Sequence, residues 1–314
     1  MPEWEIEQGI GETRAARIEG DRILEARIFL EGVARAGTRL EARLKKTGRP
    51  ALAEAAGQEY LLPKGASAVT EGERLTLEVT REAIPGAEPW KRPLAVVTDR
   101  SAGPPPATEA RELRFPASHD ELGNSGWWEM IEEARSGVVR FPGGELRVSP
   151  TPAMTLIDVD GHLPLLELGR AGAEAAALAI LRHGIGGSIG IDLPIVGGKA
   201  ERQAIAAAVD AILPQPFERT AVNGFGFLQI IRPRRHASLF ELAQDRAAFE
   251  ARALLRRIAL EDAGPKRLVA HPAVITLLKG KPGWLDALAH QIGGAVALRA
   301  DAALPMSGGY AEKL

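Results

Sequence analysis

Cysteine is absent from this 314-residue chain, which excludes disulfide bonds, zinc ribbons and thiol catalysis. Long apolar runs are absent too. Charge or glycine interrupts each run well short of the roughly 20 residues that a membrane helix needs, so we expect no membrane partner. The first residues, Met-Pro-Glu-Trp-Glu, lack the basic and apolar regions of a signal peptide. The expected location is the cytoplasm.

An excess of charge of either sign is also missing. Lys and Arg total 39 and Asp and Glu total 41, which leaves a formal net charge of −2. Net charge therefore gives no support for a nucleic-acid partner, and only a local basic patch could do so. Hydrophobic residues at 45% and charged residues at 25% are ordinary for a globular protein. The length allows two or three compact units.

The first hundred residues have the pattern of β-structure. Residues 4–31 predict a hairpin that turns at Glu19-Gly20-Asp21-Arg22. Residues 32–84 contain three strand-like stretches separated by Gly/Pro turns, which predicts a small barrel. Residues 94–97 predict one more strand. The proline-rich stretch 99–111 is expected to be a linker.

From Trp127 onward, strands and helices alternate, which predicts an α/β layer. The expected strands are 138–141, 146–148, 154–158, 188–192 and 225–231, and the expected helices are 127–136, 172–183 and 199–213. The remaining chain predicts a long helix over 239–260, then a strand, two helices and a last strand.

Two aspartates, Asp158 and Asp192, each end a short apolar strand. A strand–helix–strand unit joins them, and the ends of two parallel strands lie side by side at the carboxyl edge of a sheet. Carboxylates that meet there repel each other unless a cation lies between them, and Mg²⁺ prefers oxygen ligands. Asp160 follows at a spacing that allows it to face the same side. The alternative is that these strand-end aspartates cap turns or helices.

A basic run, Arg232-Pro-Arg234-Arg235, follows the next strand of the same layer. We expect it at a carboxyl edge as well, where arginine offers a two-pronged donor to phosphate oxygens. The alternative is a solvated run of charge. The six histidines show no metal-binding spacing, and no nucleophilic serine motif occurs.

Several segments, in collinear order over most of the chain, resemble the ribonuclease E/G family. They are Ile6–Arg14, Arg140–Gly144, Met154–Gly161, Gly186–Asp192, Gly226–Arg234 and His271–Leu278. The resemblance implies an α/β (α+β) fold: an RNase H-like subdomain interrupted by an S1/OB-type β-barrel, a DNase I-like α/β subdomain and a small C-terminal α/β domain. The implied RNase H-like subdomain comprises residues 1–31 and 85–130, and the barrel comprises residues 32–84. The DNase I-like subdomain would be residues 131–240, and the small C-terminal domain residues 241–314.

The resemblance also implies the chemistry of the site. Asp158 and Asp192 match the family's magnesium ligands, which Mn²⁺ could also occupy. Arg232 and Arg234 match its RNA-binding arginines. We add Asp160 as a catalytic residue, because it stands where the family usually has Asn. Further RNA contacts are expected from Arg235, Lys199 and Tyr60.

Besides Asp160, the chain departs from the family pattern in four further features. Leu52 and Leu61 replace the barrel's two RNA-stacking phenylalanines, which leaves Tyr60 as the local aromatic. The loop before Asp192 reads His183-Gly184 instead of Arg-Asp. The segment that senses a 5′ monophosphate and the cysteines of the zinc link are both missing.

These features predict a magnesium-dependent endonuclease for single-stranded RNA that is indifferent to the 5′ end. The sequence does not decide whether the protein forms a homodimer, but a zinc-linked homodimer is not expected. One alternative is an RNA-binding protein of the same fold with weak or no nuclease activity. Another is a hydrolase of a different phosphate ester.

Overall fold

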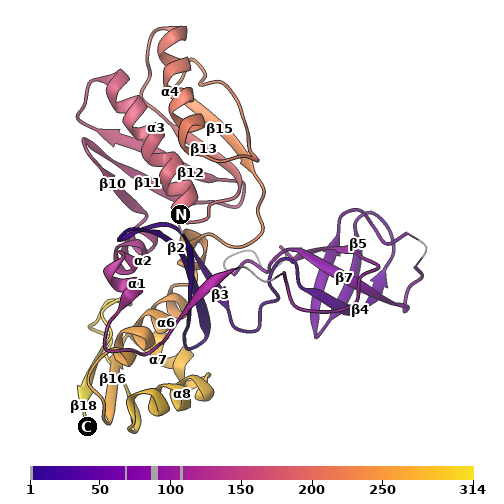
Figure 1. The fold of residues 1–314 in the computed structure, drawn as a ribbon, viewed down its shortest axis with the longest axis vertical. Helices are drawn as coiled ribbons and strands as arrows, with labels where there is room; N and C mark the ends of the chain where they lie inside the picture. Colours follow the sequence, from indigo (N-terminus) through magenta and orange to yellow (C-terminus); the bar gives the residue numbers. More distant parts are fainter. Residues whose placement is uncertain (1–2, 68, 86–90, 107–108) are drawn as a thin grey trace. The chain divides into compact units, whose positions relative to one another are not determined.

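The computed structural model describes residues 3–67, 69–85, 91–106 and 109–314 (Figure 1). Residues 107 and 108 of the expected linker lie outside the described residues. The fold is mixed α/β, with a closed five-stranded barrel and several sheets. The chain separates into two units. Unit 1 comprises residues 1–31, 110–132 and 242–314, and unit 2 comprises residues 32–109 and 133–241.

The N-terminal part of unit 1 is a four-stranded sheet in the order β3-β2-β1-β9. Its first three strands are antiparallel neighbours, and the predicted turn at Glu19–Arg22 joins β2 to β3. The elements are β1 (Glu3–Gln8), β2 (Glu12–Glu19), β3 (Arg22–Leu30), β9 (Ala110–Leu113), α1 (Glu121–Asn124) and α2 (Trp127–Ser136). The bounds predicted for α2 are confirmed.

The C-terminal part of unit 1 packs three helices against a small sheet in the order β17-β16-β18. Its elements are α6 (Arg246–Ala259), β16 (Lys266–Ala270), α7 (Pro272–Lys279), α8 (Pro282–Ile292), β17 (Val296–Ala300) and β18 (Tyr310–Lys313). The expected long helix over 239–260 is interrupted. It forms two helices, α5 (Leu239–Leu242) and α6, and the Asp245 side chain caps the start of α6 by accepting from the Ala248 amide.

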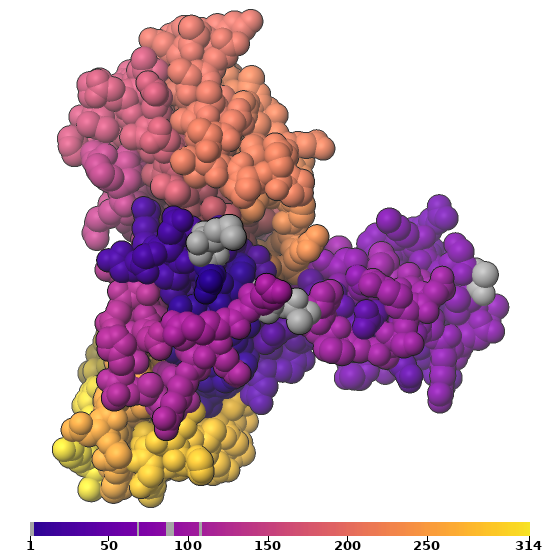
Figure 2. Space-filling model, in the orientation of Figure 1, coloured from indigo at the N-terminus to yellow at the C-terminus, as the bar shows by residue number. Residues whose placement is uncertain are grey.

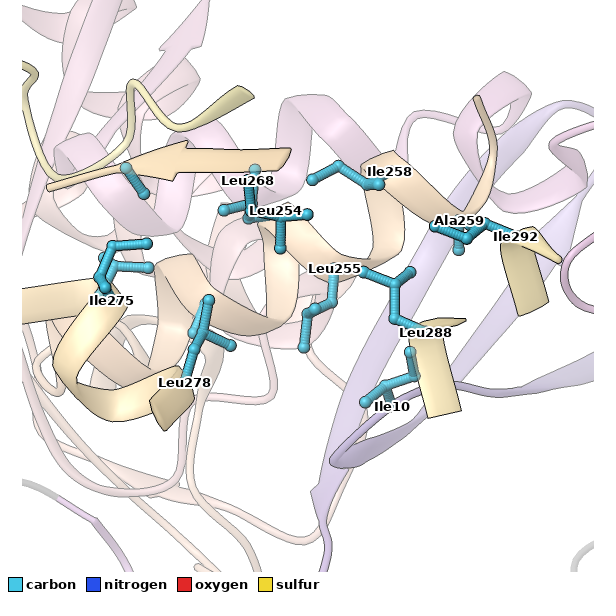
Figure 3. Packing of buried hydrophobic residues seen from close by; sticks show 13 residues of the cluster. Ile10, Leu254, Leu255, Ile258, Ala259, Leu268, Ile275, Leu278, Leu288 and Ile292 are labelled. Atoms are coloured by element: carbon cyan, nitrogen blue, oxygen red, sulfur yellow. The ribbon is translucent and has the colours of Figure 1, made fainter. Parts of the chain in front are cut away.

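The core of this part includes Ile10, which comes from the N-terminal end of the chain and lies beside Leu255 and Leu288 (Figure 3). The expected separate C-terminal domain, 241–314, therefore shares a core with the N-terminal sheet. Shared burial of apolar side chains is the physical reason that the two segments form one unit.

The barrel of unit 2 closes in the order β4-β5-β6-β8-β7. Its strands are β4 (Arg39–Lys46), β5 (Ala51–Ala55), β6 (Gln58–Leu62), β7 (Arg74–Arg81) and β8 (Leu94–Val97). The predicted barrel range, 32–84, is too short, because β8 pairs with both β6 and β7 and closes the gap between them. The core is filled largely by alanine and leucine.

The second part of unit 2 is a six-stranded sheet in the order β10-β11-β12-β13-β15-β14. In Figure 2 its residues, coloured from pink to orange, form one continuous rounded body. The elements are β10 (Val138–Phe141), β11 (Gly144–Pro150), β12 (Thr155–Gly161), α3 (Leu165–Arg182), β13 (Gly187–Asp192), α4 (Lys199–Ile212), β14 (Glu218–Arg219) and β15 (Phe227–Arg232). β12 and β13 run parallel, joined through α3, and the other paired strands in the sheet are antiparallel.

Both helices of this part, α3 and α4, lie on one side of the sheet (Figure 1). Side chains that face them, such as Ile157, Ile189 and Ile230, are buried. Side chains of the opposite face are more exposed, and Leu156 and Ile231 retain 39% and 57% of their accessible surface. Because successive strand residues alternate between faces, this pattern leaves one face of the sheet open. Among the described residues, no helix is long and apolar enough to cross a membrane.

Candidate active site

The two strand-end aspartates are direct neighbours. Asp158 of β12 and Asp192 of β13 are partners in the parallel register. Adjacent strands lie about 4.8 Å apart, so their carboxylates project from neighbouring backbones. The crossover through α3 is what makes β12 and β13 parallel and brings their carboxyl ends to one edge. The predicted pairing of these residues is confirmed.

The surroundings of Asp158 shift the pKa of its carboxyl group upward. Burial raises its pKa, and the negative charges of Asp160 and Asp192 raise it further. The Val159 amide and the charge of Arg147 oppose this change without cancelling it. A carboxyl group whose ionised form is disfavoured in this way gains from a bound cation.

Asp160 shares the open face with Asp158. Strand β12 continues to Gly161, and along it Ile157 and Val159 are buried while Asp158 and Asp160 are exposed. The expectation that the strand stays extended through Val159 is confirmed, and Asp160 lies within the strand instead of in a turn. Three carboxylates therefore lie together at this edge.

Arg147 of β11 is the positively charged side chain beside these carboxylates. Its backbone pairs with Asp158, and its Nε lies 3.8 Å from Asp160 Oδ2. Both side chains are more than half exposed, and Arg147 also binds Glu145 at 2.6 Å. An exposed pair at that distance neutralises little charge, so the carboxylates keep a net negative potential.

The donor set suits a hard divalent cation. Mg²⁺ binds to proteins through one or two carboxylates and completes its shell with waters and substrate phosphates. In such a site Asp158 and Asp192 would supply the two carboxylates, and Asp160 could supply a further oxygen donor. Among the described residues, no three His, Cys, Asp or Glu side chains already converge on one point. Waters and phosphate oxygens would supply the remaining ligands.

The arginine run lies at the opposite end of the strands, which corrects the expectation that it shares the edge with the aspartates. β15 is antiparallel to β13, so Asp192 pairs with Phe227 and Arg232 pairs with Gly187. Five residue steps along the strand separate these two pairs, a span of about 17 Å. The mistake was one of strand direction, because a basic run after a strand lies at the carboxyl edge only if that strand is parallel.

The arginines also have structural partners. Arg232 donates to the Ile185 carbonyl at 3.2 Å, and Arg234 pairs with Glu241. Glu241 in turn accepts from the Ser238 amide and hydroxyl at 2.9 and 3.0 Å. Arg235 is exposed, and its carbonyl accepts the Glu82 amide at 2.9 Å.

Lys199 stands at the far end of the connection that leaves the carboxylate edge after Asp192. It is exposed and begins α4, and only residues 193–198 separate it from Asp192. The connection therefore starts at the carboxylate edge. Lys199 also stands in the first turn of a helix, whose free amides favour anions.

Tyr60 is not presented to solvent. It lies in the barrel core with 4% of its surface exposed, and burial raises its pKa. This corrects the expectation that Tyr60 contacts RNA. The alternation of β6 turns Tyr60 and Leu62 inward and Leu61 outward, where Leu61 pairs with Leu52.

The altered loop before Asp192 has a structural role at its first residue. His183 is fully buried at the end of α3, and its Nε2 lies 2.7 Å from Glu133 Oε2. Its ring packs against Phe240 with centroids 4.5 Å apart. Burial lowers the pKa of His183, against the opposing charge of Glu133. We assign His183 to packing, away from the carboxylates.

Sequence reasoning missed three residues of the open face. Arg147 faces the carboxylates, and its signal was the alternation of Glu145, Arg147 and Ser149. The ring of Phe227 lies over Gly190: a Cβ at Gly190 would be 2.4 Å from Phe227 Cζ. Phe225, in the turn before β15, keeps 80% of its surface exposed. A Gly-Phe-Gly-Phe sequence directly before a strand was the available signal for both rings.

Comparison with known proteins assigns no family. No protein-family model matches the chain, and no curated protein is significantly similar to it in sequence.

Proposed function

We propose that this protein is a magnesium-dependent endonuclease that hydrolyses phosphodiester bonds in single-stranded RNA. The observation that carries the proposal is the direct pairing of Asp158 with Asp192 at the end of two parallel strands. The raised pKa of Asp158 and the weak compensation by Arg147 support a cation at this position. Mn²⁺ is expected to substitute for Mg²⁺, because it accepts the same carboxylate and water ligands.

Each residue of the edge has a distinct task in this proposal. Asp158 and Asp192 would hold the ion, and Asp160 would hold it directly or through one of its waters. A bound Mg²⁺ supplies charge stabilisation at the phosphate and lowers the pKa of a bound water. Lys199 would contact a flanking phosphate from the first turn of α4, and Arg147 would orient the carboxylates or a phosphate.

Single-stranded RNA is favoured over other phosphate esters by three features. The face of the sheet that bears the carboxylates is open, so a polymer can pass across it without an end entering a pocket. A closed five-stranded barrel belongs to the same chain, and barrels of this size bind single strands in many proteins. The segments that resemble the ribonuclease E/G family include both metal-binding strands.

One observation favours an RNA-binding protein with little nuclease activity. Arg232 and Arg234 lie about 17 Å along the strands from the carboxylates and are held by protein partners. Fewer arginines are therefore available to stabilise charge in the transition state. In this alternative the carboxylates would bind a cation that only neutralises the backbone of bound RNA.

Cleavage of a labelled single-stranded RNA, with Mg²⁺ and with EDTA, separates these functions. We expect internal cuts that need the metal, equal rates for 5′-monophosphate and 5′-hydroxyl substrates, and slow cleavage of a duplex with the same sequence. Binding without cleavage at any Mg²⁺ concentration would favour the RNA-binding alternative. Hydrolysis of a small phosphodiester with no action on RNA would favour another phosphate ester.

A further inference from the structure

The most exposed large apolar side chains of the described residues gather at the carboxylate edge. They are Phe225, Ile195 and Leu165, with 80%, 61% and 59% of their surface exposed. Each belongs to a connection that opens on this edge: Leu165 follows β12, Ile195 follows β13, and Phe225 precedes β15. These exposed side chains do not contribute the stabilisation that burial would give. Exposed apolar surface beside polar groups is typical of binding sites.

The turn that carries Phe225 is held rigidly. The Asn223 side-chain oxygen accepts the amides of Phe225 and Phe227 at 2.9 and 3.0 Å. The Asn223 backbone bonds with Gly226 at 3.2 Å and with Phe227 at 3.0 Å. These bonds hold the backbone that carries the exposed phenyl ring, so binding a partner costs little further backbone entropy.

The same turn is attached directly to the carboxylate strand. The Leu193 amide, one residue after Asp192, donates to the Gly226 carbonyl at 3.1 Å. Gly226 has a φ of 87°, and a Cβ there would lie 2.1 Å from the Leu193 oxygen. Only glycine fits this close contact, which fixes the turn beside Asp192. Phe225 lies two residues, at most about 7 Å of chain, before the residue that pairs with Asp192.

We propose that Phe225 stacks on a nucleobase of the single-stranded RNA, next to the phosphate held at Asp158 and Asp192. This inference rests on the proposed RNA substrate. A nucleotide combines the two chemistries that are adjacent here: an anionic phosphate that a carboxylate-bound cation attracts, and a flat π-face that stacks on an aromatic ring. Every base offers such a face, so the contact selects single strands without selecting a sequence. A duplex keeps its bases stacked inside and gains nothing from Phe225.

The test compares Phe225→Ala and Phe225→Tyr with the control Ile231→Ala. Ile231 is 57% exposed on the same strand, β15, at the end away from the carboxylates. Affinity is measured with Ca²⁺, which also takes oxygen ligands, in place of Mg²⁺, for a single-stranded RNA and for an abasic ribose-phosphate strand of equal length. We expect Phe225→Ala to weaken RNA binding about tenfold, within the range known for one stacked base, and to leave abasic-strand binding unchanged. Phe225→Tyr and Ile231→Ala should stay within about twofold of the wild type.

Three results would overturn the inference: an RNA affinity that Phe225→Ala leaves unchanged, an equal loss for both strands, or a dimer that dissociates in Phe225→Ala while RNA affinity stays constant. The last would assign the ring to contact with a second copy. A failure of the stacking proposal can be distinguished from a failure of the nuclease proposal. An RNA that binds through Phe225 but is never cut removes only the nuclease, whereas cleavage with no dependence on Phe225 removes only the stacking contact.

Discussion

Two groups of carboxylates in this protein have opposite electrostatic surroundings. In unit 1, acids and arginines alternate in a chain that we call the buried ion chain: Asp120, Arg256, Glu7, Arg14, Glu12 and Arg252. Its links are 2.6 to 3.1 Å long, and three positive charges balance three negative charges. In unit 2, the carboxylate edge (Asp158, Asp160 and Asp192) has one exposed arginine beside it, Arg147, whose Nε lies 3.8 Å from Asp160 Oδ2.

The comparison separates a group of acids whose charges are paired within the protein from a group whose charges are largely unpaired. Buried charges are tolerated when partners replace the lost water, and every side chain of the buried ion chain has at least one partner of opposite charge. The carboxylate edge leaves its repulsion uncompensated, which costs stability and is retained where a ligand supplies the missing charge. The pKa directions agree: the pKa of Asp120 is lowered and that of Asp158 is raised.

The largest expected effect concerns cleavage. Asp192→Asn should slow RNA cleavage about 10⁴-fold, or about 5.5 kcal/mol, because a carboxylate ligand of the metal is lost. RNA affinity should stay near the wild-type value, and stability should be equal or slightly higher, because one of the repelling charges is removed. Asp210→Asn is the matched control, since Asp210 is an aspartate on α4 that pairs with Arg219 at 2.7 Å. Equal cleavage rates in wild type and Asp192→Asn would place the chemistry elsewhere.

The next effect concerns stability. Arg256 has a side chain that is 1% exposed and binds both Glu7 and Asp120. Arg256→Met should lower the free energy of unfolding by about 3 to 5 kcal/mol, because it removes the only cation that pairs with Asp120 in the buried ion chain and leaves Glu7 with Arg14 alone. The control Arg299→Met breaks an exposed pair with Glu312 and should cost less than about 1 kcal/mol. Denaturant titration measures both, and similar losses in the two variants would contradict the distinction.

A smaller effect is expected from pH. Burial by itself raises the pKa of Asp120, but hydrogen bonds and charge from Arg256 outweigh it and leave the pKa lowered. The stabilisation from Asp120 is therefore complete above the ordinary aspartate value of about 4 and is lost as the pH falls through the lower, folded-state value. Asp120→Asn should remove this part of the acid dependence of unfolding. An unchanged acid profile in that variant would show that the pair adds no pH-dependent stability.

The smallest effect tests Asp160. If its carboxylate contributes to the metal site, Asp160→Asn should raise the Mg²⁺ concentration for half-maximal cleavage about threefold to tenfold, or up to about 1.4 kcal/mol. The maximal rate at saturating Mg²⁺ should change little. An unchanged midpoint would leave Asp158 and Asp192 as the ligands and Asp160 as a neighbour.

The parts of the site that depend on local sequence were predictable. Asp158 and Asp192 each end an apolar strand, and the helix between them requires a parallel pair, so their meeting follows from residues 154–192 alone. That Asp160 lies on the same face of the sheet as Asp158 follows from the alternation of side chains along a strand. The helices α2 and α4 were also located closely, because apolar periodicity and a following glycine or proline mark them.

The parts that depend on distant pairing were not predictable. The direction of β15 is set by its partner β13, and nothing in the sequence around Arg232 records it. The sequence Glu59-Tyr60-Leu61-Leu62 has adjacent apolar residues, so its inward face was ambiguous. The buried ion chain joins residues up to 249 positions apart, such as Arg256 and Glu7, which look like ordinary surface charges in the sequence.

Direct metal binding tests the central claim. Titration with Mn²⁺, followed by the electron paramagnetic resonance signal of the free ion, should show one competable site in the wild type and in Asp210→Asn. Mg²⁺ should displace the ion, and the Asp158→Asn/Asp192→Asn variant should lose the site while remaining folded. Equal Mn²⁺ binding in the wild type and this double variant would contradict the assignment of the carboxylate edge as the metal site.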